Sequence, residues 1–139
     1  GRENIYLSGM LLGFSEQQVA ELIDEIIEFS ELGKFIDRPV RTYSSGMYSK
    51  LAFSITSTLK TDIMLIDEVL SVGDAKFKKK SYARMKELIS DKERTVIIVS
   101  HNSDTIRKLC DSVLWMHEGQ IKMQGEPETV MQAYEEFMS

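Results

Sequence analysis

The chain has a single cysteine, Cys110, so it cannot form a disulfide within itself. That fits a protein of the reducing cytosol, in which Cys110 would serve as a small apolar side chain. No apolar stretch approaches the ~20 residues of a membrane-spanning helix, and no signal peptide opens the sequence, so we expect any membrane to be reached through a partner. Acidic residues outnumber basic ones, 22 to 17. A net charge of −5 gives no electrostatic reason to bind nucleic acid.

What is present is the composition of an ordinary globular protein, with 42% hydrophobic and 28% charged residues in a chain of 139. This length predicts one domain with a modest core. The basic run Lys78-Lys79-Lys80 is interpreted as a solvated helix face.

The first third of the sequence has helical patterns. Residues 1–14 form a loose one, interrupted by Gly9 and Gly13. A clearer helix is expected after Ser15, with Gln18 as its capping-box partner and Gly33 at its end. A third helix is expected to start near Ser45 or Gly46. The predicted buried positions are Val19, Leu22, Ile23, Ile26 and Ile27 in the second helix, and Tyr48, Leu51, Ala52, Ile55 and Leu59 in the third.

The remainder alternates between short apolar runs and helical patterns. The runs lie at 63–66, 96–99 and 113–116. Short continuous apolar runs are typical of parallel strands that are buried on both faces, so the order predicts a βαβαβ arrangement. Two helices are predicted between the runs: one with Phe77, Ser81, Met85, Leu88 and Ile89 inward, and a short one near 103–109. After the third run we predict a turn at Glu118-Gly119 and an edge strand with Ile121 and Met123. A closing helix is predicted from Pro127, with Val130, Tyr134 and Phe137 inward.

The segment from Tyr43 to Met47 (Tyr-Ser-Ser-Gly-Met) lies at the expected start of the third helix. Small residues let the backbone approach a ligand closely, and a helix start offers free N–H groups and a positive dipole end. Both properties suit a phosphate group. The alternative is an ordinary N-cap, since Ser-Gly is common at helix starts.

Asp67 and Glu68 end the first apolar run, which would place two carboxylates at the carboxyl edge of the sheet, where α/β proteins bind ligands. Asp67 would hold Mg²⁺ directly or through water, and Glu68 would orient or deprotonate an attacking water. The alternative is a strand end that caps the next turn. The following turn, Ser71 to Asp74, by itself favours a solvated connector in which Asp74 caps a helix.

Ser100-His101-Asn102 follows the second apolar run. A histidine at this edge can hydrogen-bond a terminal phosphate, and the alternative is a polar loop residue. His117 has no such context and is interpreted as structural.

Taken in this order and spacing, the four segments resemble the ATP-binding subunits of ABC transporters, and the resemblance covers essentially the whole chain. The correspondence is Ser44, Ser45, Gly46 and Met47 with the signature motif, Asp67 with the Walker B aspartate, Glu68 with the catalytic glutamate, Ser71 to Asp74 with the D-loop, and His101 with the switch histidine. The Glu118 to Ile121 hairpin and Gly125-Glu126-Pro127 also look like the end of that family's domain.

A finer resemblance rests on Gly1 to Leu7 and Thr42 to Tyr48, which look like the ATPases that export teichoic acid, O-antigen or capsular polysaccharide. Ser45 and Met47 replace the usual glycine and glutamine, which fits that branch. The replacement also gives the second backbone position of the motif a side chain.

A P-loop, G-x-x-x-x-G-K-[ST], is missing from these 139 residues. The Gly33-Lys34 pair is followed by Phe35, and Glu28 stands where the first glycine is required. The resemblance implies that the P-loop, its strand and the glutamine loop precede Gly1. We therefore expect the chain by itself to be inactive.

The predicted fold is α/β: a P-loop NTPase-like parallel half-sheet in 61–139, preceded by a helical signature subdomain in 1–60. The resemblance implies a head-to-tail homodimer in which ATP on one P-loop is capped by the other subunit's signature. It further implies Mg²⁺, a permease partner and the cytoplasmic face of the membrane. In that arrangement Asp74 joins the signature residues toward the nucleotide, Asp67 places the metal, and Glu68 and His101 are catalytic.

Two other functional classes remain open. One is an ABC ATPase without a transported substrate, such as a DNA-repair or ribosome-associated member. The acidic chain, without a coiled-coil insertion or a basic arm, disfavours it. The other is a binding module without enzymatic activity.

Overall fold

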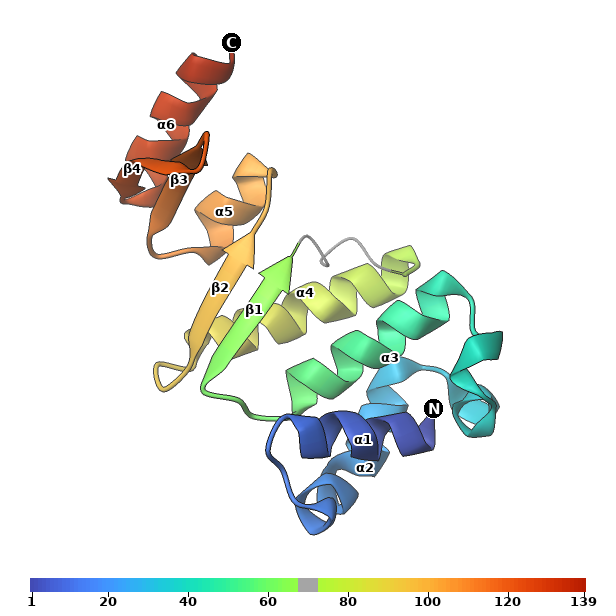
Figure 1. Cartoon of the computed structure of the whole chain (residues 1–139). Coiled ribbons are helices and arrows are strands. Elements are labelled where there is room, and N and C mark those ends of the chain that lie inside the picture. The colour runs from blue at the N-terminus through green and yellow to red at the C-terminus, as the bar shows by residue number, and fades with distance from the viewer. Residues whose placement is uncertain (68–72) are drawn as a thin grey trace. The chain divides into compact units, whose positions relative to one another are not determined.

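The computed structural model describes residues 1–67 and 73–139. Helices and strands alternate in the later part of the chain, which confirms the α/β class (Figure 1). The elements in chain order are α1 (Arg2–Leu11), α2 (Glu16–Ser30), η1 (Gly33–Asp37), η2 (Val40–Thr42), α3 (Ser45–Thr58), β1 (Ile63–Asp67), α4 (Ala75–Ser90), β2 (Thr95–Val99), α5 (Ser103–Leu109), β3 (Val113–His117), β4 (Gln120–Gly125) and α6 (Pro127–Met138).

The chain divides into two compact units. The first contains Gly1–Met64 and the described part of Val69–Thr95, which includes α1 to α4. The second contains the end of β1 and Val96–Ser139.

In the first unit, α1 and α2 pack closely because Gly9 has no side chain. A Cβ at Gly9 would collide with Val19, so this glycine is a packing point inside α1 rather than an interruption of the helix. α2 begins as predicted, with a capping box between Ser15 and Gln18. Its end differs from the prediction: Glu31, at φ 57°, is the left-handed C-cap, and Gly33 instead opens η1. After this cap the chain enters the core at Leu32, whose side chain is only 5% exposed.

The buried face of α3 is rotated from the predicted one. Leu51, Ile55 and Leu59 are buried as expected, but Tyr48 is 57% exposed and Ala52 is also exposed. Packing against α4 explains the difference, because it buries Phe53 instead.

Phe29, Phe53 and Phe77 bring α2, α3 and α4 together. The ring centroids lie 5.8 to 6.3 Å apart, and Phe77 meets both other rings edge to face. Phe77 is fully buried. The other predicted inward residues Ser81, Met85 and Leu88 are also buried, with at most 9% exposure. This aromatic cluster gives the first unit a rigid centre.

In the described residues the strands form two sheets instead of one. β1 and β2 are neighbouring parallel strands joined through α4, as predicted, whereas β3 pairs antiparallel with β4. Glu118 and Gly119, at φ 49° and 76°, form a two-residue turn that folds β4 back onto β3. The prediction of one βαβαβ sheet was therefore wrong for the third apolar run.

The strands are also not buried on both faces. Leu65 is 74% exposed, Ile97 50% and Val99 60% in this chain. In the second unit, the inward face of α6 packs on Trp115, whose ring is 5.4 Å from Tyr134 and 5.2 Å from Phe137. Val130 is fully buried as predicted, while Phe137 keeps 47% exposure beside Trp115.

Candidate nucleotide-contacting site

The start of α3 has a conventional side-chain cap. Ser44 precedes the helix, its Oγ accepts a hydrogen bond from the Met47 amide at 3.2 Å, and its carbonyl accepts one from the Tyr48 amide at 3.0 Å. The capping role considered from sequence is therefore present. The Ser44 side chain, however, accepts from only one backbone amide of the first turn, that of Met47. The amides of Ser45 and Gly46 lie in the first turn, where backbone N–H groups have no partner within the helix.

The side-chain position of Gly46 is open. Apart from the neighbouring backbone of the helix, a Cβ built there would find only Ser44 Oγ, at 3.9 Å, within 4 Å. Ser44 and Ser45 are exposed, and the first turn of α3 contains no acidic residue. A helix start with accessible amides and no negative side chain can take an anion.

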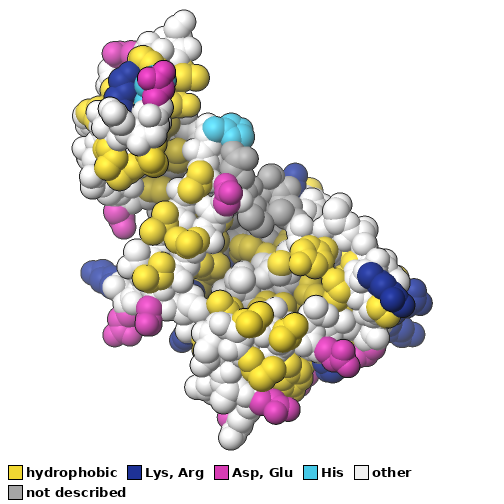
Figure 2. Space-filling model, viewed as in Figure 1, with side chains coloured by type: hydrophobic (Ala, Val, Ile, Leu, Met, Phe, Trp, Pro, Cys, Tyr) yellow, Lys and Arg dark blue, Asp and Glu magenta, His cyan; other side chains and the backbone are white. Residues whose placement is uncertain are grey.

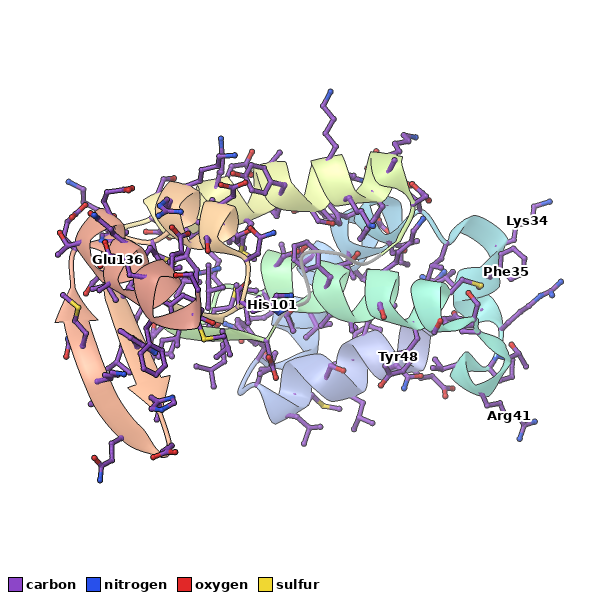
Figure 3. The ribbon with its side chains drawn as sticks, turned by 90° about the horizontal axis from the view of Figure 1, so that it is seen from above. Lys34, Phe35, Arg41, Tyr48, His101 and Glu136 are labelled. Atoms are coloured by element: carbon purple, nitrogen blue, oxygen red, sulfur yellow. The ribbon has the colours of Figure 1, made fainter. Side chains whose placement is uncertain are left out.

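The side chain of Met47 faces elsewhere. It packs against the hydrophobic core of the helices, so any contact from Met47 to a ligand would come from its backbone. Tyr48 lies on the exposed side of α3, and Phe35 and Arg41 lie in the segment between α2 and α3 (Figure 3). The hydroxyl of Tyr43 donates to the Phe35 carbonyl at 2.6 Å and fixes this segment where it enters α3. Burial raises the pKa of Tyr43, which keeps that hydroxyl a donor.

Asp74 caps α4. This is the role that the sequence of the Ser71 to Asp74 turn, considered by itself, favours. Its Oδ1 accepts from the Phe77 amide at 2.9 Å. Its Oδ2 accepts from Lys50 Nζ of α3 at 2.8 Å. The hydrogen bond from Lys50, followed by that from the Phe77 amide, lowers the pKa of Asp74 to about 2. Lys50 was not among the residues selected from sequence, because nothing local marks its partner 24 residues away.

Asp67 and His101 lie at corresponding ends of two neighbouring parallel strands. Asp67 is the last residue of β1, and His101 follows the end of β2 by two positions. Both residues are exposed (His101 is marked in Figure 3). The loop that carries His101 is fixed by Asn102, whose Oδ1 accepts from the Thr105 amide at 2.9 Å and whose own amide donates to Ser100 Oγ at 3.0 Å. Glu68 and Ser71, also selected from sequence, lie outside the described residues.

The predicted magnesium role fits the chemistry of Asp67. Within the described ranges, no three His, Cys, Asp or Glu side chains form a metal-binding group. Mg²⁺ typically takes one or two carboxylates and completes its shell with nucleotide phosphates and water. An exposed carboxylate at a strand end suits that mode of binding.

The fold matches that of solved ABC ATPase domains over part of their length. The chain superposes on a solved ATP-binding subunit of an ABC transporter with a TM-score of 0.79 at 20% identity, covering 96% of this chain and 55% of that one. It also matches the ATP-binding cassette MJ0796, solved as a dimer in a post-hydrolysis state with ADP and Pi, with a TM-score of 0.70 at 19% identity over 91% of this chain and 56% of that chain. At these identities the likeness establishes the fold alone.

Sequence similarity narrows the class. The chain is 49% identical over 138 residues to the teichoic acids export ATP-binding protein TagH of Lactococcus lactis, covering 99% of this chain and 29% of that protein. It is 44% identical over 139 residues to the O-antigen export ATP-binding protein RfbB of Klebsiella pneumoniae, covering 100% of this chain and 56% of that protein. The chain is therefore homologous to part of the ATP-binding subunits of teichoic acid and O-antigen export ABC transporters.

The chain thus spans between 29% and 56% of the length of these two relatives. No protein-family profile matches it. Among the helices that the structure describes, none is long and apolar enough to cross a bilayer.

Proposed function

We propose that this chain is the signature-bearing part of an ATP-hydrolysing subunit that powers export of a polysaccharide or teichoic acid. The observation that carries the proposal is the start of α3, where the exposed Ser44 and Ser45 stand beside Gly46, whose side-chain position is open. The names of the relatives, which are teichoic acid and O-antigen export proteins, support the substrate class. By the complete subunit we mean a protein in which this chain is preceded by a P-loop.

Each candidate residue receives a role. Ser44 and the backbone from Ser45 to Met47 contact the γ-phosphate of ATP that is held by a second subunit, and Asp74 supports that contact. Asp67 places Mg²⁺, which supplies positive charge beside the phosphates. Glu68 polarises the attacking water, and His101 hydrogen-bonds the γ-phosphate. Catalysis by this set is positioning and electrostatic stabilisation, as in other phosphoryl transfers.

The helical part of the first unit is proposed as the surface that meets a membrane permease, which would place the subunit at the cytoplasmic face of the membrane. α1 presents Leu7, Met10 and Leu11 with 53%, 51% and 80% exposure. Figure 2 shows hydrophobic side chains on the face that carries this helix. An apolar patch of this kind is typical of a protein-binding surface.

The test is Glu68→Gln in the complete subunit. ATP hydrolysis should fall by on the order of 10³-fold or more, while ATP binding by calorimetry stays unchanged, because the side-chain shape remains and only the charge is lost. Glu93→Gln, in an exposed turn, is the matched control and should hydrolyse ATP normally. Near-normal hydrolysis by Glu68→Gln would remove Glu68 from the mechanism. A complete subunit that neither binds nor hydrolyses ATP would overturn the function itself.

The 139-residue chain by itself should show no meaningful hydrolysis, because a P-loop supplies most phosphate contacts. Micromolar ATP binding or turnover that Glu68→Gln abolishes would contradict this expectation.

A further inference from the structure

Lys50 lies on α3 less than two turns after its Ser44 cap, and its side chain is only 16% exposed. Its ammonium group stands 5.0 Å from the centre of the Phe77 ring, which is fully buried and packed edge to face against two other rings. The amine therefore lies over a buried aromatic surface. An ordinary solvated lysine samples many rotamers, whereas burial and contact with the ring restrict this one.

The direction leads to the turn at Gly73 and Asp74. Lys50 Nζ donates to Asp74 Oδ2 at 2.8 Å, while Oδ1 of the same carboxylate caps α4. Gly73, at φ 85°, lies against the lysine stem: a Cβ there would be 3.2 Å from Lys50 Cε and 3.1 Å from Phe77 Cδ1. The turn is thus fixed against α3 by a charged hydrogen bond and by close packing.

A second carboxylate faces the same amine. Glu31, the left-handed C-cap of α2, places Oε2 3.9 Å from Lys50 Nζ. Its Oε1 is 3.6 Å from Lys76 Nζ and 3.5 Å from Lys80 Nζ. Lys50 is therefore the point at which the end of α2, the start of α3 and the start of α4 are joined by charge.

We propose that Lys50 is a positioning residue that couples the phosphate-contacting start of α3 to the Gly73-Asp74 turn. This inference rests on the proposed function. An anion arriving at Ser45 and Gly46 pulls on α3, and the Lys50–Asp74 bond passes that displacement to the turn. The ammonium group thus links the ligand-contacting helix to the turn that leads into α4.

The experiment measures dimerisation of the complete subunit by analytical ultracentrifugation in saturating Mg-ATP, in a Glu68→Gln background that prevents hydrolysis. The variants are Lys50→Met, which keeps the stem over Phe77 and removes the charge, and Asp74→Asn, which keeps a capping oxygen. Lys76→Met is the control, because Lys76 also faces Glu31 but is 83% exposed and does not touch Asp74. ATP affinity of the monomer and thermal midpoints are recorded for each.

We expect Lys50→Met and Asp74→Asn each to weaken ATP-dependent dimerisation about tenfold, with monomer ATP affinity unchanged and the double variant no worse than either single one. Lys76→Met should match the parent. Multiplying losses in the double variant, or dimerisation within about twofold of the parent for Lys50→Met, would overturn the coupling. A parent protein that does not dimerise with ATP would overturn the proposed function together with it, so the two failures are distinguishable.

Discussion

Asp74 and Lys50 join two helices through one carboxylate, whose Oδ2 accepts from the lysine at 2.8 Å while Oδ1 caps α4 at 2.9 Å. Their separation in sequence is 24 residues. Because both oxygens are engaged, different replacements of Asp74 can separate the helix cap from the charged hydrogen bond to Lys50. Asparagine keeps an oxygen for the cap and loses the charge, whereas alanine loses both.

The first prediction concerns pH. The pKa of Asp74 is lowered from 3.8 to about 2 in the folded chain, so its contribution to stability is complete above 3.8 and is lost as the pH falls toward 2. Asp74→Asn should therefore be less stable than the parent at pH 6, and the difference in thermal midpoint should shrink below pH 3.8. Thermal unfolding followed by circular dichroism across that range measures this, with Asp104→Asn, at an exposed position of α5, as control. A gap independent of pH would contradict the ion-pair assignment.

A second prediction concerns Gly73. Gly73 and Gly13 both have positive φ, 85° and 92°, but only Gly73 has atoms where a side chain would lie. Alanine strains the backbone at both positions, and at Gly73 it also displaces Phe77 and Lys50. We expect Gly73→Ala to lower the free energy of unfolding by about 1–3 kcal/mol more than Gly13→Ala. Urea denaturation of the two variants compares them directly, and equal losses would show that the packing against Lys50 is not tight.

The helix starts were predictable because their signals are local. The capping box at Ser15 and the cap at Ser44 follow from side chains within three residues of the amides that they accept from. The start of α3, which carries the candidate site, was placed correctly for that reason. The end of α2 was not, because Leu32 enters the core through contacts that no local pattern encodes.

Contacts between elements that are distant in sequence decided which sheet the third apolar run joins and what Lys50 contacts. An apolar run such as 113–116 fits a parallel or an antiparallel strand equally well. The hairpin at Glu118-Gly119 was predicted, but the βαβαβ prediction also placed this run in the sheet of β1 and β2, and there it was wrong. Lys50 was overlooked for a similar reason. Lysine on a helix is normally solvated, and its role depends on Asp74 and Phe77 arriving from another helix. The phosphate-contacting role of Ser44 to Met47 remains a prediction.

A third prediction concerns self-association of the 139-residue chain. Leu65, Ile97 and Val99 expose apolar side chains from neighbouring strands, and such a surface favours association between copies. Sedimentation velocity should show a weight-average mass that rises with concentration, and Leu65→Lys should reduce the rise. Thr56→Lys, on the exposed side of α3, is the control for added charge. Monomeric behaviour at all concentrations would contradict the prediction.

The last prediction separates a phosphate site from a simple helix cap at the start of α3. Gly46 is the second residue of the helix, and a Cβ there meets only Ser44 Oγ, at 3.9 Å. Gly46→Asp is therefore tolerated sterically, and a negative charge in the first turn suits the helix dipole by roughly 0.3–1 kcal/mol. If the segment were only a cap, this variant would be as stable as the parent or more stable, and it would function normally.

If the segment instead contacts a phosphate, Gly46→Asp should impair function although it does not lower stability. The aspartate places a negative charge where the γ-phosphate of the second subunit would arrive, so ATP-dependent dimerisation of the complete subunit should be lost while thermal stability is kept. Gly46→Asn, of nearly equal shape and without charge, is the matched control and should retain more dimerisation than Gly46→Asp. Sedimentation with and without Mg-ATP, together with thermal unfolding, measures both properties on the same samples. Unchanged dimerisation of Gly46→Asp would leave Ser44 to Met47 as a helix cap, because a like charge cannot be neutral beside a bound polyphosphate.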